Sequence, residues 1–248
     1  MKTAAAGTMP SLSKAPGFVI TCEHGGNEIP AAYAALFDQH HALLLTHRGY
    51  DPGALLMAND LSKAFDAPLV CATVSRLLVD LNRSIGNPTL HFEAVPVALH
   101  PDILQTHYVP YRTEAERVVR QAIADHGRVI HISSHSFTPE LNGEVRRADI
   151  GLLYDPARPG EVALAAQWKA ALKTQACDLV VRRNYPYQGK GDGLASWLRR
   201  HLSPDVYVGI ELEINQKHVF NAGQQWAALR RLIVTTLCEA QRNAAGSE

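Results

Sequence analysis

Two histidines follow short apolar runs, at the points where buried strands are expected to end. His24 stands before two glycines, and His135 lies in the run Ser134-His135-Ser136-Phe137. Histidine is the commonest metal ligand and acid–base side chain near neutral pH, and ligands of open α/β sheets gather outside the carboxyl ends of the strands. Both histidines are therefore candidate metal ligands. The alternative for His24 is a simple glycine turn with the imidazole in solvent.

His131 lies deeper in the same apolar run as His135. Strand alternation puts His131, Ser133 and His135 on one side of the strand. A histidine inside a strand is more often a hydrogen-bonded core residue, and we expect this of His131. The neighbouring serines lack the Gly-x-Ser-x-Gly elbow that presents a serine nucleophile in α/β hydrolases, which argues against a serine hydrolase.

An Asn-Arg pair, Asn82 and Arg83, ends the apolar run 77–81. Arginine holds carboxylates through two parallel charge-assisted hydrogen bonds, and asparagine can donate beside it. The pair therefore suits an acidic substrate, with Arg83 as the anchor. A surface ion pair with a nearby carboxylate is the alternative for an isolated arginine.

Two glutamates, Glu211 and Glu213, interrupt the apolar run 206–214. Residues two apart point to the same face of a strand, and a buried carboxylate needs a metal, a cation or a proton-transfer role to offset its desolvation. A glutamate beside a metal-activated water is the expected general base for hydrolysis. An edge strand with one wet face is the alternative.

The elements that must position these residues follow an α/β pattern, in which short β-branched apolar runs alternate with helical periodicity. Strands are expected over residues 18–22, 68–74, 77–81, 128–132, 149–154, 179–182 and 206–214. Helices are expected over 52–65, from a capping box at Thr113 and Glu116 to a stop at Gly127, after Pro159, and over about 224–241. We predict a single domain over 17–243, with tails at 1–16 and 244–248. The loops 84–101 and 184–193 are expected to form walls of a site.

The composition excludes several functional classes. The 248 residues carry 24 basic and 24 acidic side chains, and 46% are apolar. This balance is typical of a globular protein and argues against disorder and against electrostatically driven nucleic-acid binding. The longest apolar runs fall far short of the roughly 20 residues of a membrane span, so no membrane partner is expected. Four scattered cysteines without a CxxC pair favour a reducing cytoplasm. A homo-oligomer is compatible with the sequence.

The order His24, Asn82-Arg83, His135, Glu213 resembles that of the zinc carboxypeptidase-like fold, and within that fold the chain resembles the N-formylglutamate amidohydrolase family. The similar segments are CEHGGN at 22–27, DLNR at 80–83, SHSF at 134–137, ADIGLLYD at 148–155, NYPY at 184–187 and GIELE at 209–213. The resemblance implies a single α/β domain with a mixed central sheet flanked by helices. It also implies one Zn²⁺ per chain and hydrolysis of a linear amide.

The resemblance assigns His24, Asp51 and His135 as zinc ligands and Glu213 as the general base. Glu213 is preferred over Glu211 because the similarity centres on the carboxylate that precedes Ile-Asn-Gln.

The carboxylate ligand departs from the carboxypeptidase pattern. Carboxypeptidases carry a glutamate three residues after the first histidine, where this chain has Asn27. The ligand is then Asp51 or Glu28, and Asp51 is chosen because the family carries an aspartate in this region. Asp51 before Pro52 also matches the start of a helix, with the aspartate as its N-cap.

For the substrate, the resemblance implies that Arg83 holds a carboxylate and helps the metal to stabilise the oxyanion. The expected substrate-binding residues are Asn82, Arg83, Arg146, Arg147, Tyr185 and Tyr187. The sequence does not choose between Arg146 and Arg147 as a further cation, or between Tyr185 and Tyr187 as the residue that closes the pocket. A second departure is Gln188, since an arginine often follows the NYPY segment in the family.

The expected reaction is hydrolysis of N-formyl-L-glutamate, or of a related small acidic N-acyl amino acid, to formate and the amino acid. One alternative is a carboxypeptidase- or aspartoacylase-like deacylase with the same metal chemistry. An alternative of another class is a catalytically silent protein that binds a small acid.

Overall fold

The structure, a computed structural model, describes residues 15–220 and 223–245. A six-stranded sheet runs in the order β2-β1-β3-β8-β6-β7. Its strands are β1 (Gly17–Cys22), β2 (Leu69–Cys71), β3 (Val129–Phe137), β6 (Ile150–Leu153), β7 (Val181–Arg183) and β8 (Tyr207–Asn215). Strands β2, β1, β3 and β8 are parallel, β6 runs antiparallel to β8, and β7 runs parallel to β6. The predicted single α/β domain with a mixed central sheet is confirmed.

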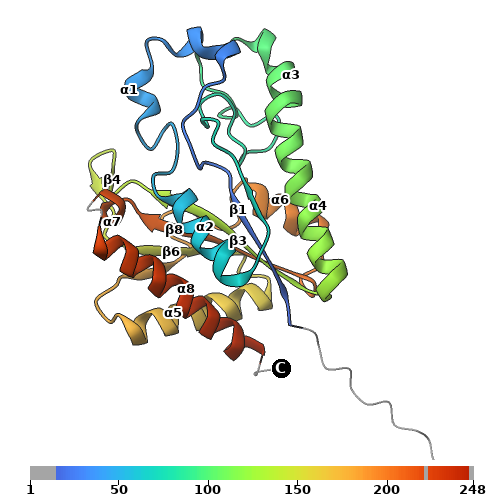
Figure 1. Ribbon diagram of the computed structural model, residues 1–248, viewed down its shortest axis with the longest axis vertical. Helices are drawn as coiled ribbons and strands as arrows, with labels where there is room; N and C mark the ends of the chain where they lie inside the picture. Colours follow the sequence, from blue (N-terminus) through green and yellow to red (C-terminus); the bar gives the residue numbers. More distant parts are fainter. Residues whose placement is uncertain (1–14, 221–222, 246–248) are drawn as a thin grey trace, which may run out of the picture.

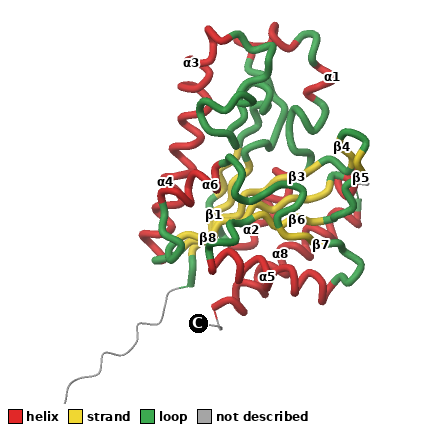
Figure 2. Tube along the Cα trace, turned by 180° about the vertical axis from the view of Figure 1, so that it is seen from behind, coloured by secondary structure: helices red, strands yellow, loops and turns green. Residues whose placement is uncertain are grey.

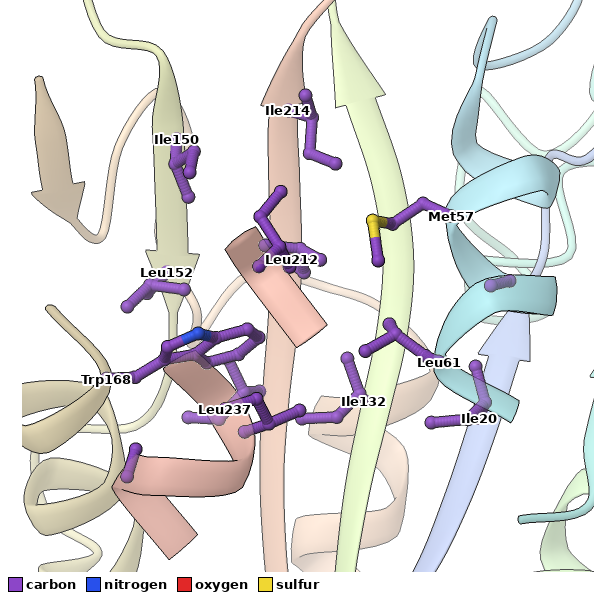
Figure 3. Close-up of a cluster of buried hydrophobic side chains, with 14 of the residues drawn as sticks. Ile20, Met57, Leu61, Ile132, Ile150, Leu152, Trp168, Leu212, Ile214 and Leu237 are labelled. Carbon is purple, nitrogen blue, oxygen red and sulfur yellow. The ribbon is translucent and has the colours of Figure 1, made fainter. Parts of the chain in front are cut away.

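Helices cover both faces of the sheet (Figure 1). One layer contains α2 (Ala54–Phe65), α5 (Pro159–Gln175) and α8 (Gln224–Ala245), and the other contains α4 (Val109–His126) and α6 (Leu194–His201). Successive residues of β1 point to opposite layers: Ile20 packs against the first layer and Val19 against the second. In the first layer, Trp168 of α5 and Leu237 of α8 pack near Leu212 of β8 (Figure 3).

The same alternation places the polar residues of the inner strands. Ile130 and Ile132 of β3 belong to the apolar core under α2, α5 and α8, whereas Val129 packs on the α4 side. His131 and His135 lie an even number of residues after Val129 in the same strand, so they face the layer of α4 and α6. By the same argument Glu211 and Glu213 share a face with Tyr207, which packs on that side. One face of the inner strands is therefore apolar, and the other carries the polar residues of the candidate site beside a second apolar core.

The remaining elements are short and lie mostly in the loop-rich part of the molecule at the top of Figure 2. They are η1 (Ala31–Phe37), α1 (His41–Leu44), η2 (Val97–Leu99), α3 (His100–Ile103), η3 (Leu104–Tyr108) and α7 (Lys217–Phe220). A hairpin of β4 (Glu140–Leu141) and β5 (Glu144–Val145) lies outside the main sheet. Its turn residues Asn142 and Gly143 have φ angles of 54° and 80°, as the common two-residue hairpin turn requires.

The predicted strand over 77–81 is wrong, because this segment forms turns. The Leu78 amide donates to the carbonyl of Ser75 at 2.9 Å, and the Asp80 amide donates to the carbonyl of Leu90 at 2.8 Å. Leu77, Leu78, Val79 and Leu81 are nevertheless buried, in the core that α4 covers. A short apolar run indicates that its residues are buried, but its pattern does not distinguish a strand from a buried loop.

The predicted capping box at Thr113 and Glu116 is also wrong. Helix α4 begins four residues earlier, at Val109, and carries a proline in its first turn, where the missing amide donor costs nothing. Glu116 instead pairs with Arg120 one turn later, at 2.7 Å. The predicted stop is confirmed, since Gly127 has a φ of 78° and ends the helix.

The predicted boundaries at the two ends of the chain are tested only in part. Helix α8 includes residues 244 and 245, which were predicted to belong to the C-terminal tail. The rest of that tail, 246–248, and residues 1–14 of the N-terminal tail lie outside the described residues. Among the described helices, none combines the length and the hydropathy that a membrane crossing requires.

Candidate active site

A cavity of about 610 Å³ opens at the carboxyl ends of β1, β3 and β8. Most of the residues predicted from the sequence line it: His24, Asp51, Asn82, Arg83, His135, Tyr187, Glu211 and Glu213. Residues that lie more than 180 positions apart in the chain therefore meet in one pocket. This is the place at which an open α/β sheet is expected to bind its ligand.

His24, Asp51 and His135 form a tight cluster, in which one ligand atom of each lies within 4.8 Å of the others. The Nδ1 atoms of the two imidazoles both face Asp51 Oδ2, at 3.4 Å from His24 and 2.8 Å from His135. All three side chains are buried. Two imidazoles and one carboxylate are the donors of many catalytic zinc sites, so the residues present fit that metal.

The two candidates for the carboxylate, Asp51 and Glu28, lie in different places. Glu28 is exposed and accepts a hydrogen bond from Thr73 at 2.7 Å, away from the cavity. Asn27 donates to the carbonyl of Leu44. Asp51 does not cap a helix with its side chain, because the N-cap residue of α2 is Gly53. Its carboxylate is free to serve the cluster.

Each imidazole of the cluster contacts a second carboxylate through its Nε2 atom. Nε2 of His24 lies 2.8 Å from Asp80 Oδ1, and Nε2 of His135 lies 2.9 Å from Glu23 Oε2. Burial opposes the protonation of His135, but its hydrogen bonds to Asp51 and Glu23 outweigh burial and raise its pKa well above the usual value. Carboxylates placed in this way fix the ring orientation of metal-ligating histidines. The Nδ1 atoms are thereby left to point into the cluster.

Arg76, for which no role was predicted, joins two of these carboxylates. Its Nη1 lies 3.1 Å from Asp51 Oδ1, and its Nη2 lies 2.9 Å from Asp80 Oδ2. Although burial alone would raise the pKa of Asp80, Arg76 and His24 hold it well below its usual range. Arg76 and Asp80 are four residues apart in an apolar run, and that spacing of opposite charges was the available signal for a buried ion pair.

Glu213 lies directly beside the cluster, because it is the register partner of His135 across β3 and β8. Its side chain is buried, and its Oε2 has no hydrogen-bond partner within the described chain. Burial raises the pKa of Glu213 to about 8; the positive charge of His135 opposes this rise, and the carboxylate of Asp51 adds to it. A carboxyl group with a pKa close to the working pH is suited to proton transfer.

Glu211 occupies a different environment in the same cavity. Arg199 Nη1 lies 3.9 Å from Glu211 Oε1, so this carboxylate has a cation within reach. Arg199 itself is buried and also pairs with Glu161 at 3.0 Å. Burial raises the pKa of Glu211, although Arg199 opposes that rise. Of the two glutamates, Glu213 is the one with an unpartnered buried oxygen.

Asn82 and Arg83 line the cavity as predicted, but from a loop and not from the end of a strand. Asn82 is buried, and its Oδ1 accepts a hydrogen bond from the Leu194 amide at 2.7 Å. Arg83 Nη1 donates to the carbonyls of Asn82 at 3.2 Å and Asp192 at 2.8 Å. A loop at the cavity wall thus presents the guanidinium that the sequence analysis expected.

The other predicted substrate-binding residues divide into two groups. Tyr187 lines the cavity, and Arg146 stacks over its ring and donates to its hydroxyl at 3.2 Å. Arg147 is exposed. Tyr185 does not line the cavity and packs instead against Phe137.

Two histidines given little weight in the sequence have distinct positions. His131 is fully buried and hydrogen-bonded to Thr21 at 2.9 Å and to Tyr207 at 2.7 Å, as expected for a core residue. Burial lowers its pKa to about 4. His47 lines the cavity, and burial together with the positive charge of Arg76 lowers its pKa. Its place in the loop before Asp51 carried no pattern from which this position could be predicted.

Comparisons with known proteins agree with this geometry. The sequence model for N-formylglutamate amidohydrolase matches residues 17–220. A crystal structure of a gene product from Agrobacterium tumefaciens is similar, with a TM-score of 0.79 and 29% identity over 93% of this chain and 92% of that chain. The crystal structure of N-formylglutamate amidohydrolase from Ralstonia eutropha has the same fold, with a TM-score of 0.69 and 16% identity over 96% of this chain and 97% of that chain. No curated protein sequence matches.

The family match covers most of the chain and contains the whole cluster, the Asn82-Arg83 pair and Glu213. The chain therefore belongs to the N-formylglutamate amidohydrolase family, a family of hydrolases.

Proposed function

We propose that this protein is a zinc-dependent amidohydrolase that cleaves N-formyl-L-glutamate, or a related small acidic N-acyl amino acid, to formate and the amino acid. The observation that carries the proposal is the convergence of His24, Asp51 and His135 beside Glu213, whose buried Oε2 has no hydrogen-bond partner among the described residues. Membership of the family supports amide hydrolysis. One zinc ion per chain fits the single cluster of this kind found in the described residues.

Bound zinc would supply Lewis acidity, which polarises the amide carbonyl and makes water more acidic. Glu213 takes a proton from the attacking water and returns it to the leaving nitrogen as the carbon–nitrogen bond breaks. Its raised pKa suits both steps, since the group gains and loses a proton near neutral pH. Glu23 and Asp80 keep the two imidazoles oriented while this happens.

Substrate binding is assigned to residues of the cavity outside the cluster. Arg83 holds a carboxylate of the substrate, and Asn82 contributes beside it. Tyr187 covers the cavity, and Arg146 supplies a second cation through its contact with Tyr187. We prefer Arg146 to the exposed Arg147, and Tyr187 to Tyr185, for these roles.

The four cysteines are all free thiols, which supports the reducing cytoplasm expected from the sequence. The proposed partner is the small acidic substrate, with no nucleic acid or membrane surface involved. A homo-oligomer remains compatible with these assignments.

The proposed function is tested with zinc-loaded protein and a panel of substrates. N-formyl-L-glutamate should release formate, removal of zinc with a chelator should abolish the release, and added zinc should restore it. Cleavage confined to short peptides would identify a carboxypeptidase, and cleavage confined to N-acetyl-L-aspartate an aspartoacylase-like enzyme. Binding without turnover would identify a silent small-acid binding protein. Full turnover after complete removal of metal would overturn the zinc mechanism.

Glu23→Gln is expected to weaken zinc binding by about 10- to 100-fold, the usual effect of removing a carboxylate that orients a histidine ligand. The reason is that Nε2 of His135 loses its charged partner at 2.9 Å while the ligand itself stays in place. Zinc affinity is measured by competition with a chelator of known strength. The matched control is Glu161→Gln, which alters another fully buried glutamate, one paired with Arg199. An equal loss of zinc affinity in both variants would contradict the role given to Glu23.

A further inference from the structure

One aspartate, Asp192, joins the two loops that form the substrate wall of the cavity. Its carboxylate accepts three hydrogen bonds, all from the loop that follows Asn82. The donors are the Ser84 amide at 2.9 Å, the Ser84 hydroxyl at 2.5 Å and the Asn87 side-chain amide at 2.8 Å. Asp192 itself belongs to the loop 184–193 and lines the cavity. One side chain of the loop 184–193 therefore makes three hydrogen bonds to the other loop.

The backbone around Asp192 continues this contact. Its carbonyl accepts from Arg83 Nη1 at 2.8 Å, and the Leu194 amide donates to Asn82 Oδ1 at 2.7 Å. Gly193 lies between them, and a Cβ at this position would approach Asn82 Oδ1 to 2.8 Å. Residues 192–194 therefore lie against residues 82–84 one after another, so closely that a Cβ at position 193 would press on the Asn82 side chain.

The contact decides which part of Arg83 remains for a ligand. Both hydrogen bonds of Arg83 within the described chain leave from Nη1, toward the carbonyls of Asn82 and Asp192. A guanidinium binds a carboxylate best with two nitrogens on one edge. With Nη1 held, the edge formed by Nε and Nη2 is the one left to receive a carboxylate.

An acidic group in the wall of a pocket for anions would normally repel the ligand. Here the carboxylate of Asp192 is turned to donors of the neighbouring loop. The hydrogen bonds from Ser84 and Asn87 outweigh burial and hold its pKa below the usual value. The negative charge of Asp192 is therefore used in hydrogen bonds within the cavity wall. What Asp192 contributes to the cavity is the position of the loop that carries Arg83.

We propose that Asp192 is a positioning residue, which fixes the loop of Asn82 and Arg83 so that the free edge of the Arg83 guanidinium receives the carboxylate of the substrate. The inference rests on the proposed function, since it takes Arg83 as the carboxylate anchor. Asp192 acts on binding of the substrate, and the proton transfers at Glu213 do not depend on it.

The test uses zinc-loaded protein with Asp192→Ala, Arg83→Met and the double variant. Asp192→Ala should raise KM for N-formyl-L-glutamate by about 10-fold with kcat within about 3-fold of the native value, because only the anchoring of the carboxylate is weakened. In the Arg83→Met background the same substitution should add little, since the two residues act as one unit. Asp205→Ala, an exposed aspartate bonded to Ser203 before β8, is the control and should change neither constant.

Two further variants keep the test open if Asp192→Ala folds poorly. Asp192→Asn keeps one acceptor oxygen, which can still receive the Ser84 amide and the Asn87 side chain, while its amide nitrogen can donate to the Ser84 hydroxyl. This variant should recover most of the native KM. Ser84→Ala removes one donor from the other side of the contact and should raise KM in the same direction as Asp192→Ala. A fall in kcat with KM unchanged, or an equal effect of Asp192→Ala in the native and Arg83→Met backgrounds, would overturn the proposal.

Glutarate separates this proposal from the proposed reaction, because a dicarboxylate can bind Arg83 without being hydrolysed. Calorimetry should show glutarate binding weakened about 10-fold by Asp192→Ala and by Arg83→Met, with no further loss in the double variant. This result supports the role of Asp192 even if no N-acyl amino acid is cleaved. Absence of glutarate binding to the native protein, or binding that is indifferent to Asp192, would overturn it even if the amidohydrolase activity is found.

Discussion

Glu213→Gln should lower kcat of the zinc-loaded protein by about 10²- to 10⁴-fold, the usual contribution of a positioned general base. An amide cannot accept the proton of the attacking water. Zinc content should stay at the native level, because Glu213 lies beside the ligand cluster and is not one of its three members. Steady-state kinetics and metal analysis on the same preparation measure both effects.

Glu211→Gln is the matched comparison for this substitution. Both glutamates lie in one strand and line one cavity, but Glu211 has Arg199 at 3.9 Å, whereas Glu213 Oε2 has no partner in the described chain. We expect the smaller loss of kcat from Glu211→Gln. If its loss exceeds that of Glu213→Gln, the base has been assigned to the wrong residue.

The same Glu213→Gln variant should be more stable than the native protein when both are free of metal at pH 8. Folding raises the pKa of Glu213 from 4.5 to about 8, so the folded state binds this proton more tightly than the unfolded state. In the native protein this stabilisation is complete below pH 4.5 and is lost as the pH rises toward 8. Glutamine does not ionise, so the variant does not lose stability in this way. The gain at pH 8 is about 2–4 kcal/mol by linkage.

Urea unfolding of the chelator-treated proteins at pH 5 and pH 8 measures this difference. The two proteins should have similar free energies of unfolding at pH 5 and should separate at pH 8. A separation of the same size at both values of pH would mean that the substitution acts through packing and not through ionisation of Glu213.

His135→Ala should lose both zinc and activity, with turnover below about 1% of the native rate, because the metal provides the Lewis acid for the reaction. The imidazole contacts both Asp51, at 2.8 Å, and Glu23, at 2.9 Å. Elemental analysis of protein purified without chelator reports the metal, and formate release reports the reaction.

His131→Ala is the control, because it removes a second buried imidazole from the same strand. His131 contacts Thr21 and Tyr207 and takes no part in the cluster. Its loss should reduce stability by about 1–3 kcal/mol, as for other buried hydrogen-bonded groups, and should leave zinc bound. Retained turnover with full metal occupancy in His135→Ala would exclude the assigned ligand set.

Much of this site could be predicted because strands impose a simple geometry. The period of two in β3 and β8 places His135 and Glu213 on the face opposite the apolar core. The carboxyl ends of parallel strands meet at one edge, which brings His24 to the same place. Asn82 and Arg83 were located correctly although their segment was assigned the wrong structure, since burial of the preceding run is enough to hold the pair at the cavity wall.

The residues that were missed take their roles from tertiary contacts that no local pattern records. The partners of Glu23, Asp80 and Arg76 come together only in the folded structure, so the sequence alone does not predict their roles. Asp192 lies in a loop of glycines and polar residues, and its partner Ser84 is 108 residues away. Sequence spacing within one element can predict a face, but it cannot predict which distant loop lies against it.

The hairpin of β4 and β5 carries part of the cavity rim on an element that is distinct from those of the candidate metal cluster. It lies outside the main sheet, and the residue that follows it, Arg146, reaches Tyr187 at the cavity. His135 and Glu213 lie on sheet strands, His24 lies in the turn after β1, and Asp51 lies before α2. Insertions or exchanges at the Asn142-Gly143 turn would therefore alter the rim without disturbing the hydrolytic centre. In an evolving lineage or a directed-evolution library, the range of acyl amino acids accepted can drift through this hairpin while the catalytic apparatus stays unchanged.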